Sequence, residues 1–416
     1  MKNNKTVQIL FLGITLLTFS LSAIGQFKEN YWENKKNAFV ANTTAECQSS
    51  LKFCDEVLIL NPHHPVMNYL AARLNEKLGK SDIALKYMKK SAQLGYTSKV
   101  RWLEIHPMND PFFSTLRKKK DFQDIIEIMN ISDKPIHKSQ IAFTVKDKTI
   151  GTEGISYDSV EKMFYLGSDN KIVMVDHSGN SINFTKEAEQ DGLGFVNGIH
   201  VDPVRRTLWA CSNDENNANG EIFKYDLSSG KLIKKYPTPS DGNRHFFNDL
   251  VIHPNGDVYI TDTGKIFKIS HDSDKLELFF KSKSFFGSNG IALSDDGKVI
   301  YATEDIYGIC KIDIKTKSFT PLHHKKDFHT YGIDGLYFSD NYLYAIQNEL
   351  LTQVGRFSLN EDATYLKSCE ILEKNTDDLR APTTGVIVDD YFYFVADTQG
   401  KGSKLNGVVI MRASLK

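Results

Sequence analysis

The stretch Ser288-Asn289-Gly290-Ile291-Ala292-Leu293 begins the pattern on which the fold depends. It places a polar residue and a glycine before alternating apolar positions, and the turn Ser294-Asp295-Asp296-Gly297 follows it. A second apolar segment, Ile300-Tyr301-Ala302, comes next. Alternation with a period of two residues, bounded by turn residues, is typical of short β-strands with one buried face.

The same pattern recurs along the second part of the chain. Five further segments share it: Glu153–Tyr157, Asn197–Val201, Asn248–Ile252, Asp334–Phe338 and Thr384–Val388. The second residues of successive segments lie 44, 51, 41, 45 and 50 positions apart. A period of 40–50 residues with several strands in each unit is the signature of a β-propeller. The region after Lys134 has room for six blades of about 47 residues each.

The ring of such a propeller needs a closure. Gln140–Val145 precedes the first unit and is placed to pair with the last blade beside Val408–Met411, which would leave no open sheet edge. A β-sandwich is the alternative fold, but a sandwich does not require a repeating pattern. We therefore expect an all-β six-bladed propeller over residues 135–416.

The residues before the propeller have a helical period. Pro65–Lys77 places apolar side chains three and four residues apart, and Asp82–Leu94 repeats this spacing after a break at Leu78-Gly79. Two such helices joined at a glycine predict an antiparallel hairpin. A later segment, from Asp110 to Phe122, is expected to form a closing helix. Residues 26–134 are thus predicted to form a small all-α domain.

Several residues of this hairpin resemble the tetratricopeptide repeat: Asn61-Pro62, Tyr69, Ala72, Leu78-Gly79, Ala84-Leu85 and Ala92. The resemblance covers about one repeat and fragments of its neighbours. It implies a concave helical surface that captures a protein or peptide. A plain helical bundle is the alternative.

Residues 1–25 have the three regions of a secretory signal peptide. Lys2 and Lys5 precede an uncharged, mostly apolar run from Val7 to Leu21, and Ala23-Ile24-Gly25 supplies small residues for cleavage. The apolar run is shorter than the roughly 20 residues that span a membrane. We expect an exported protein, periplasmic or extracellular, with no membrane span after cleavage.

Charge and cysteine content exclude other classes. The net charge of −1 combines +2 in residues 1–25, +4 in residues 26–134 and −7 in the propeller. A chain without a basic excess is not expected to bind nucleic acid. The five cysteines form no Cys-x-x-Cys pair, and Cys47 and Cys54 are too far apart on a helix to form a disulfide.

The repeat predicts a ring of polar side chains, because equivalent positions of the blades face one central channel. The residues that open the innermost strands are Glu153, Asn197, Asn248, Asn289, Asp334 and Thr384. All of them offer oxygen atoms and none is His or Cys, which suits Ca²⁺, or less well Mg²⁺ or Mn²⁺. The alternative is that Asn or Asp before glycine only forms turns with left-handed backbone.

Taken together, Glu153-Gly154, Asn248-Asp249, Asn289-Gly290 and Asp334-Gly335 resemble the metal-binding motifs of the SMP-30/gluconolactonase/LRE-like family, six-bladed calcium-dependent propellers related to paraoxonase and diisopropylfluorophosphatase. The resemblance covers about residues 150–415. It implies that Glu153, Asn248, Asn289 and Asp334 ligate a catalytic divalent cation. It also implies that Asp334 acts as general base in the hydrolysis of a lactone or related ester.

One position departs from the family pattern. Sugar-lactone members carry an arginine two residues before the third-blade asparagine, and here that residue is Phe246, which indicates a more apolar substrate. Arg244 and His245 lie near this position but out of register. We expect Arg244, His245 and Thr384 to contact the substrate, and Asn197 either to contact it or to act as a fifth ligand. His200 is expected to be a packed or surface histidine.

Three functions therefore compete. The first is a secreted, metal-dependent hydrolase of a lactone or ester. The second is a non-catalytic module in which the propeller and helices bind a protein or peptide, because fold alone does not determine function. The third is a strictosidine-synthase-like propeller, which would not need the ring of oxygen ligands.

Overall fold

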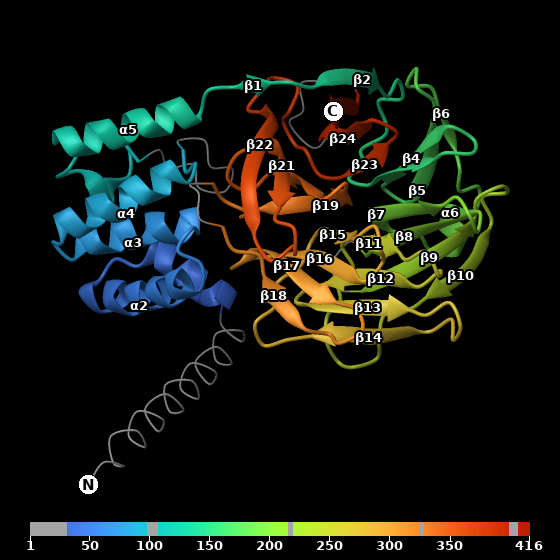
Figure 1. Cartoon of the computed structure of the whole chain (residues 1–416), viewed down its shortest axis with the longest axis horizontal. Coiled ribbons are helices and arrows are strands. Elements are labelled where there is room, and N and C mark those ends of the chain that lie inside the picture. The colour runs from blue at the N-terminus through green and yellow to red at the C-terminus, as the bar shows by residue number, and fades with distance from the viewer. Residues whose placement is uncertain (1–30, 98–106, 215–218, 325–327, 399–406) are drawn as a thin grey trace, which may run out of the picture.

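The protein is a β-propeller with a helical region packed against its side (Figure 1). The computed structural model describes residues 31–97, 107–214, 219–324, 328–398 and 407–416. Within these residues the strands form six antiparallel sheets, and each sheet is one blade of the propeller. The predicted fold class, a six-bladed propeller preceded by helices, is confirmed.

Each blade places its first strand innermost, and the last blade takes its outermost strand from the start of the propeller. Blades 1 and 2 comprise β3 (Ile155–Asp158), β4 (Met163–Ser168), β5 (Lys171–Val175), β6 (Ser181–Asn183), β7 (Phe195–Asp202), β8 (Thr207–Asn213), β9 (Gly220–Asp226) and β10 (Leu232–Tyr236), with the short helix α6 (Ala188–Asp191) between them. Blades 3 and 4 comprise β11 (Leu250–Ile252), β12 (Val258–Asp262), β13 (Lys265–Ile269), β14 (Leu276–Lys281), β15 (Ile291–Leu293), β16 (Val299–Glu304), β17 (Gly308–Asp313) and β18 (Phe319–Pro321). Blades 5 and 6 comprise β19 (Ile333–Ser339), β20 (Tyr342–Gln347), β21 (Gln353–Leu359), β22 (Leu366–Lys374), β23 (Gly385–Val388), β24 (Tyr391–Asp397) and β25 (Val409–Ser414).

The innermost strands close a ring around the channel. Each contacts the innermost strand of the next blade, and β23 of the last blade contacts β3 of the first. The strand β2 (Gln140–Thr144) pairs with β25, in the register Gln140 to Arg412 and Thr144 to Val409. This is the closure that the sequence predicted, and it pairs the outer edge of the last blade.

The glycines of the repeat let neighbouring inner strands approach closely. A Cβ on Gly154 would lie 2.2 Å from the carbonyl oxygen of Asn197, and one on Gly290 would lie 2.5 Å from that of Asp334. Neither glycine has a positive φ, so neither serves as a left-handed turn residue. Asn197, Asn248, Asn289 and Asp334 are not among the residues with a positive φ either, so the alternative in which they only form left-handed turns is wrong. The glycines instead pack one blade against the next.

The helical region consists of a helical segment over residues 31–40 and the elements that follow it. They are α2 (Thr44–Leu60), α3 (Pro65–Lys77), α4 (Ser81–Gln93), the 3₁₀ turn η1 (Pro111–Phe113) and α5 (Lys120–Ser132). The hairpin of α3 and α4 agrees with the prediction, and Gly79 between them has a φ of 74°. The closing helix begins only at Lys120, because Asp110 caps η1 and Pro111 starts that short turn instead.

The helical region and the propeller share one hydrophobic core. Ile306 and Leu350 of the propeller are buried in the same cluster as residues of α2, α3 and α5. Asn61 Nδ2 donates a hydrogen bond to the Ile306 carbonyl at 2.6 Å, and Lys374 Nζ donates to the Ser132 carbonyl at 2.9 Å. The helices are therefore docked on blades 4 and 5, beside β17, β18, β21 and β22 (Figure 1).

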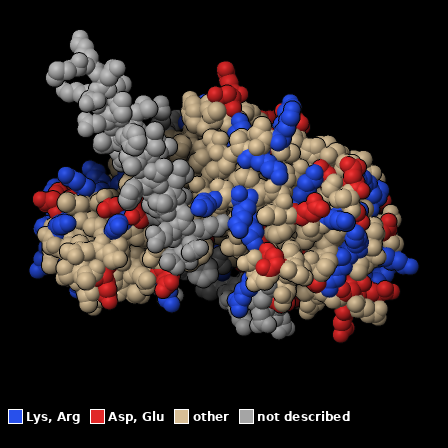
Figure 2. All heavy atoms as spheres, turned by 90° about the horizontal axis from the view of Figure 1, so that it is seen from below, with Lys and Arg blue, Asp and Glu red and all other residues tan. Residues whose placement is uncertain are grey.

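The described residues also bear on the predictions for membrane spans, cysteines and surface charge. The predicted signal peptide lies outside the described residues. No helix in the described part of the chain is long and apolar enough to cross a membrane. All five cysteines are free thiols, as the sequence indicated. On the face shown in Figure 2, basic and acidic side chains are interspersed over the propeller without a large patch of one sign.

Candidate functional site

A cavity of about 790 Å³ opens where the innermost strands begin. Five of the six residues predicted to face the channel line it: Glu153, Asn197, Asn248, Asn289 and Asp334. They come from five successive blades, so rotation about the channel brings side chains nearly 200 positions apart in sequence into one space. We call this space the main cavity.

Irregular strand pairing positions two of these side chains. The pairing of β7 with β8 shifts between Val196 and Ile199, and that of β19 with β20 shifts between Ile333 and Leu336. Each shift is a β-bulge, which re-aims side chains at that point of a strand. Asn197 and Asp334 lie within these bulges and reach the main cavity.

Hydrogen bonds orient Glu153 through two asparagines. Asn197 Nδ2 donates to Glu153 Oε2 at 2.8 Å, and Asn197 Oδ1 accepts from Asn213 Nδ2 at 2.6 Å. Asn213 is anchored in turn to the carbonyl of Phe247 at 2.9 Å. Because the amide oxygen of Asn197 is already engaged, this residue positions the carboxylate.

Asp334 is held in a similar way. Asn348 Nδ2 donates to Asp334 Oδ2 at 2.6 Å and to the Pro382 carbonyl at 2.9 Å. Burial and the nearby carboxylate of Glu153 raise the pKa of Asp334 to about 8, although hydrogen bonds from Asn348 and Asn289 oppose the shift. In the absence of a bound cation, the carboxylates of Glu153 and Asp334 therefore repel each other in a poorly solvated space.

The sixth blade differs from the prediction by one position. The Val395 N–H donates to the Thr384 carbonyl, as the Gly167 N–H does to the Gly154 carbonyl, so Thr384 matches the glycine of the repeat. Thr383 occupies the ring position and lines the main cavity. The hydroxyls of Thr383 and Thr384 both donate to the Glu153 carbonyl. Thr384 instead lines a separate pocket further along the channel.

The segment before the third-blade asparagine also corrects the prediction. Arg244 is exposed and is not among the residues that line the main cavity. His245 is buried between two carboxylates, with Nδ1 2.8 Å from Asp262 Oδ2 and Nε2 2.9 Å from Asp241 Oδ1. Phe246 does line the cavity and gives it an apolar wall. Its backbone N–H donates a hydrogen bond to Asp262 Oδ1 at 2.9 Å, which fixes the position of this residue.

The main cavity is strongly acidic. Besides Glu153 and Asp334, it is lined by Asp169, Asp214 and Glu349, and no lysine or arginine is among its described lining residues. Within the described part of the chain, no three His, Cys, Asp or Glu side chains cluster so as to hold a metal ion. A cation in this cavity would therefore depend on amide oxygens as well as carboxylates.

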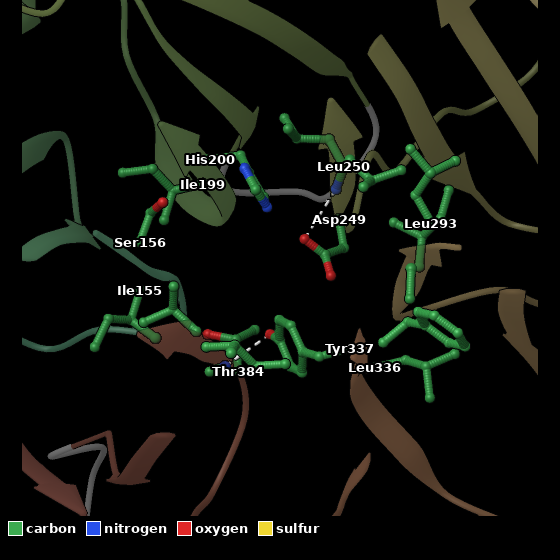
Figure 3. A pocket seen from close by; sticks show the side chains of 17 residues that line it. Ile155, Ser156, Ile199, His200, Asp249, Leu250, Leu293, Leu336, Tyr337 and Thr384 are labelled. Atoms are coloured by element: carbon green, nitrogen blue, oxygen red, sulfur yellow. Dashed lines mark hydrogen bonds between the residues drawn. The ribbon is translucent and has the colours of Figure 1, made fainter. Parts of the chain in front are cut away.

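A second pocket, of about 200 Å³, lies further along the same inner strands. Its lining is largely apolar, and the side chains of His200 and Asp249 enter it from neighbouring strands (Figure 3). Burial raises the pKa of Asp249 to about 7 and lowers that of His200. This pocket has one carboxylate and lacks the converging set of oxygen side chains that the main cavity has.

Sequence reasoning missed the residues that support the ring. Asn213 and Asn348 stand at equivalent positions of blades 2 and 5. Each lies five residues after the first residue of the second apolar segment of its blade, which is Leu208 in blade 2 and Leu343 in blade 5. Asp305 has the same position counted from Ile300 in blade 4. A polar residue at this position of the repeat was therefore the feature of the sequence that could have identified the residues supporting the ring.

Comparison with known proteins gives only distant likenesses. No family model and no curated protein matches the chain. Among solved structures, a protein proposed to be a gluconolactonase is 12% identical with a TM-score of 0.48, covering 67% of this chain and 92% of that one. Virginiamycin B lyase from Staphylococcus aureus is 15% identical with a TM-score of 0.44, covering 66% and 98%. Likenesses at this level carry no information on substrate or chemistry.

Proposed function

We propose that the protein is a divalent-cation-dependent hydrolase of a lactone or related ester. One observation carries the proposal: the carboxylates of Glu153 and Asp334 and the amides of Asn248 and Asn289 line the same cavity at the mouth of the propeller channel. The cavity is large enough for a small ester, and Phe246 gives it an apolar wall.

The donor set fits a hard divalent cation. Burial and the neighbouring carboxylate of Glu153 raise the pKa of Asp334, so a cation between the two acids would favour their ionised forms. None of the described lining residues is a lysine or arginine that could supply this charge. Carboxylate and amide oxygens are the ligands that Ca²⁺ prefers, and Mg²⁺ or Mn²⁺ also accept them. We infer that Glu153, Asn248, Asn289 and Asp334 would hold the cation.

The proposed reaction uses Asp334 as general base. Its carboxylate accepts a proton from the attacking water, and the water oxygen bonds to the ester carbonyl carbon. The bond to the leaving oxygen then breaks, and that oxygen takes the proton from Asp334, which returns the base to its ionised form. When bound, the cation would keep Asp334 ionised, polarise the carbonyl and lower the pKa of water. Asn348 holds the base in position, and Phe246 covers the apolar part of the substrate.

The test is hydrolysis of a panel of lactones and aryl esters by the full-length protein. We expect EDTA to abolish turnover, Ca²⁺ to restore it, and Asp334→Asn to lose at least 100-fold in kcat/KM, as is typical when a general base is removed. Asp295→Asn, an exposed aspartate in a turn of blade 4, is the matched control and is expected to retain activity. Activity that survives both EDTA and Asp334→Asn would refute the proposal.

A binding measurement separates the hydrolase from a non-catalytic module. We expect Ca²⁺ to raise the melting temperature of the protein and Glu153→Gln to lose this effect, because a ligand that binds only the folded state stabilises it. A Ca²⁺-dependent melting temperature without turnover on any ester would favour the non-catalytic alternative. Ester turnover without any effect of Ca²⁺ on melting would contradict the assigned cation site.

A further inference from the structure

A smaller pocket of about 190 Å³ adjoins the main cavity. The two share Phe246, Asn248, Asn289 and Glu349 among their lining residues, so a ligand at the proposed cation site could extend from one into the other. We call the smaller space the side pocket. Its lining includes Trp32, which belongs to the helical region and not to the propeller.

The helical segment over residues 31–40 holds Trp32 at this pocket. Tyr31 is buried and packs against Phe286 of the propeller, with 6.0 Å between the ring centroids. Lys35 Nζ donates to the Tyr331 hydroxyl of blade 5 at 2.9 Å. These contacts flank Trp32, whose side chain stays 52% exposed and available to a ligand. The side pocket is therefore incomplete without the helical region.

The polar part of the side pocket is acidic. Glu304, Asp305 and Glu349 line it, and no lysine or arginine does so among the described residues. Asp305 Oδ2 is buried and accepts no hydrogen bond within the described part of the chain. A buried carboxylate oxygen without a donor is costly, so a positive charge placed in the pocket would offset part of that cost.

The position of Lys35 shows that the aromatic rings near the side pocket can hold an ammonium group. Lys35 Nζ lies 4.7 Å from the ring centroid of Trp32 and 5.2 Å from that of Tyr331. An ammonium at this distance from an aromatic face is held by cation–π attraction. One ammonium is thus already placed beside the carboxylates, yet Asp305 still lacks a donor.

We propose that the side pocket binds a protonated amine carried by the substrate. An aromatic wall of Trp32 and Phe246 together with the carboxylates of Glu304, Asp305 and Glu349 suits an ammonium. This inference rests on the proposed function for the ester itself. It narrows the substrate class to amino-substituted lactones or esters, and it gives the helical region a role in substrate selection.

The test compares two alcohols of nearly equal shape by isothermal titration calorimetry on the full-length protein. One is 2-(dimethylamino)ethanol, which is protonated at neutral pH, and the other is its uncharged carbon analogue, 3,3-dimethyl-1-butanol. We expect the amine to bind at least 10-fold more tightly. Glu349→Gln and Trp32→Leu should each weaken amine binding about 3- to 30-fold, the range that corresponds to a lost ion pair or cation–π contact.

Lys35→Gln, which removes the charge but keeps an N–H donor for the Tyr331 hydroxyl, supplies a variant with the opposite expected direction. Removing this ammonium takes a positive charge away from Asp305 and Trp32, so the amine should bind more tightly, by about 3-fold or more. Equal binding of the two alcohols, or unchanged amine binding in both Glu349→Gln and Trp32→Leu, would overturn the proposal. Circular dichroism and melting curves would confirm that each variant is folded.

The acetate esters of the same two alcohols connect the pocket to catalysis. If both are hydrolysed, we expect the amine ester to have the higher kcat/KM and Glu349→Gln to bring the ratio of the two towards one. If neither is hydrolysed but the alcohols still differ in affinity, the side pocket stands and the hydrolase proposal is weakened. Faster hydrolysis of the neutral ester would contradict the side-pocket proposal alone.

Discussion

Gly154 lies so close to Asn197 that a Cβ on the glycine would fall 2.2 Å from the asparagine's carbonyl oxygen. The two residues belong to the innermost strands of neighbouring blades, β3 and β7, which contact each other directly. The same relationship joins Gly290 to Asp334, at 2.5 Å. The spacing of the ring residues around the channel thus depends on glycines that allow the backbones to meet.

Gly154→Ala should therefore destabilise the propeller. The new methyl group would meet the backbone carbonyl of Asn197 and, at 2.8 Å, the Cγ2 atom of the buried Ile199. The backbone carbonyl cannot move aside as the end of a flexible side chain would, so we expect a loss of about 2–4 kcal/mol in the free energy of unfolding. Gly151→Ala is the matched control, because its Cβ would meet only the Thr398 carbonyl at an ordinary 3.4 Å. Urea denaturation measures both, and equal stability of the two variants would refute the packing argument.

The asparagines behind the carboxylates should tune cation binding. Asn348→Ser removes the donor at 2.6 Å from Asp334 Oδ2, and we expect it to weaken Ca²⁺ affinity about 10- to 100-fold, as for other residues that orient metal ligands. Titration calorimetry with Ca²⁺ measures the effect. Asn180→Ser, at an exposed turn of blade 1, should leave the affinity unchanged. Equal affinities of Asn348→Ser and the parent protein would show that Asn348 does not position the site.

Stability should fall in acid because of Glu373. Its side chain is fully buried, and burial alone would raise its pKa, but hydrogen bonds from Ser139, Thr376 and His137 outweigh this and lower it. A lowered folded-state pKa stabilises the protein above the unfolded-state value of about 4.5. That stability is lost as the pH falls through the folded-state pKa.

We accordingly expect the melting temperature to decline below about pH 4.5 and Glu373→Gln to decline less steeply over the same range. Glu277→Gln, at an exposed position of β14, should follow the parent curve. Parallel curves for Glu373→Gln and the parent protein would contradict the assignment. The residues involved tie β1 (Ile136–His137) to β22, so the loss would begin where the chain enters the propeller.

The helices and blades should unfold together. Ile306 is completely buried in the core that the two regions share, so Ile306→Ala should cost about 2–5 kcal/mol. We expect a single calorimetric transition in the parent protein, and a single transition at lower temperature in the variant. Val204→Ala changes a side chain that is 82% exposed and should have little effect. Two separate transitions in the parent protein would show that the shared core does not couple the regions.

Much of the architecture follows from local pattern. The period of the repeat predicted six blades, the closing strand and the hairpin of α3 and α4, and the structure confirms each of them. Four of the ring positions proposed as cation ligands, Glu153, Asn248, Asn289 and Asp334, line one cavity. Their role in binding a cation remains a prediction that the titrations above address.

The local sequence pattern could not show which residue of the last blade occupies the ring position. Thr383 and Thr384 are chemically alike, and only the hydrogen bond from Val395 N to the Thr384 carbonyl shows which of them occupies the ring position. Arg244 and His245 present a similar case. His245 is buried and paired with Asp241 and Asp262, and it is not among the residues that line the main cavity.

The periodic alternation of polar, glycine and apolar residues was sufficient to specify strands, blades and the ring, because these depend on side-chain direction along a strand and on a fixed repeat length. The partners of the ring residues required the folded chain. Asn348 approaches Asp334 through a strand pairing interrupted by a bulge, and Trp32 reaches the side pocket only because the helices share a core with blades 4 and 5. Such contacts depend on packing between distant segments, so the repeat could mark the position of Asn348 as polar but could not identify its partner.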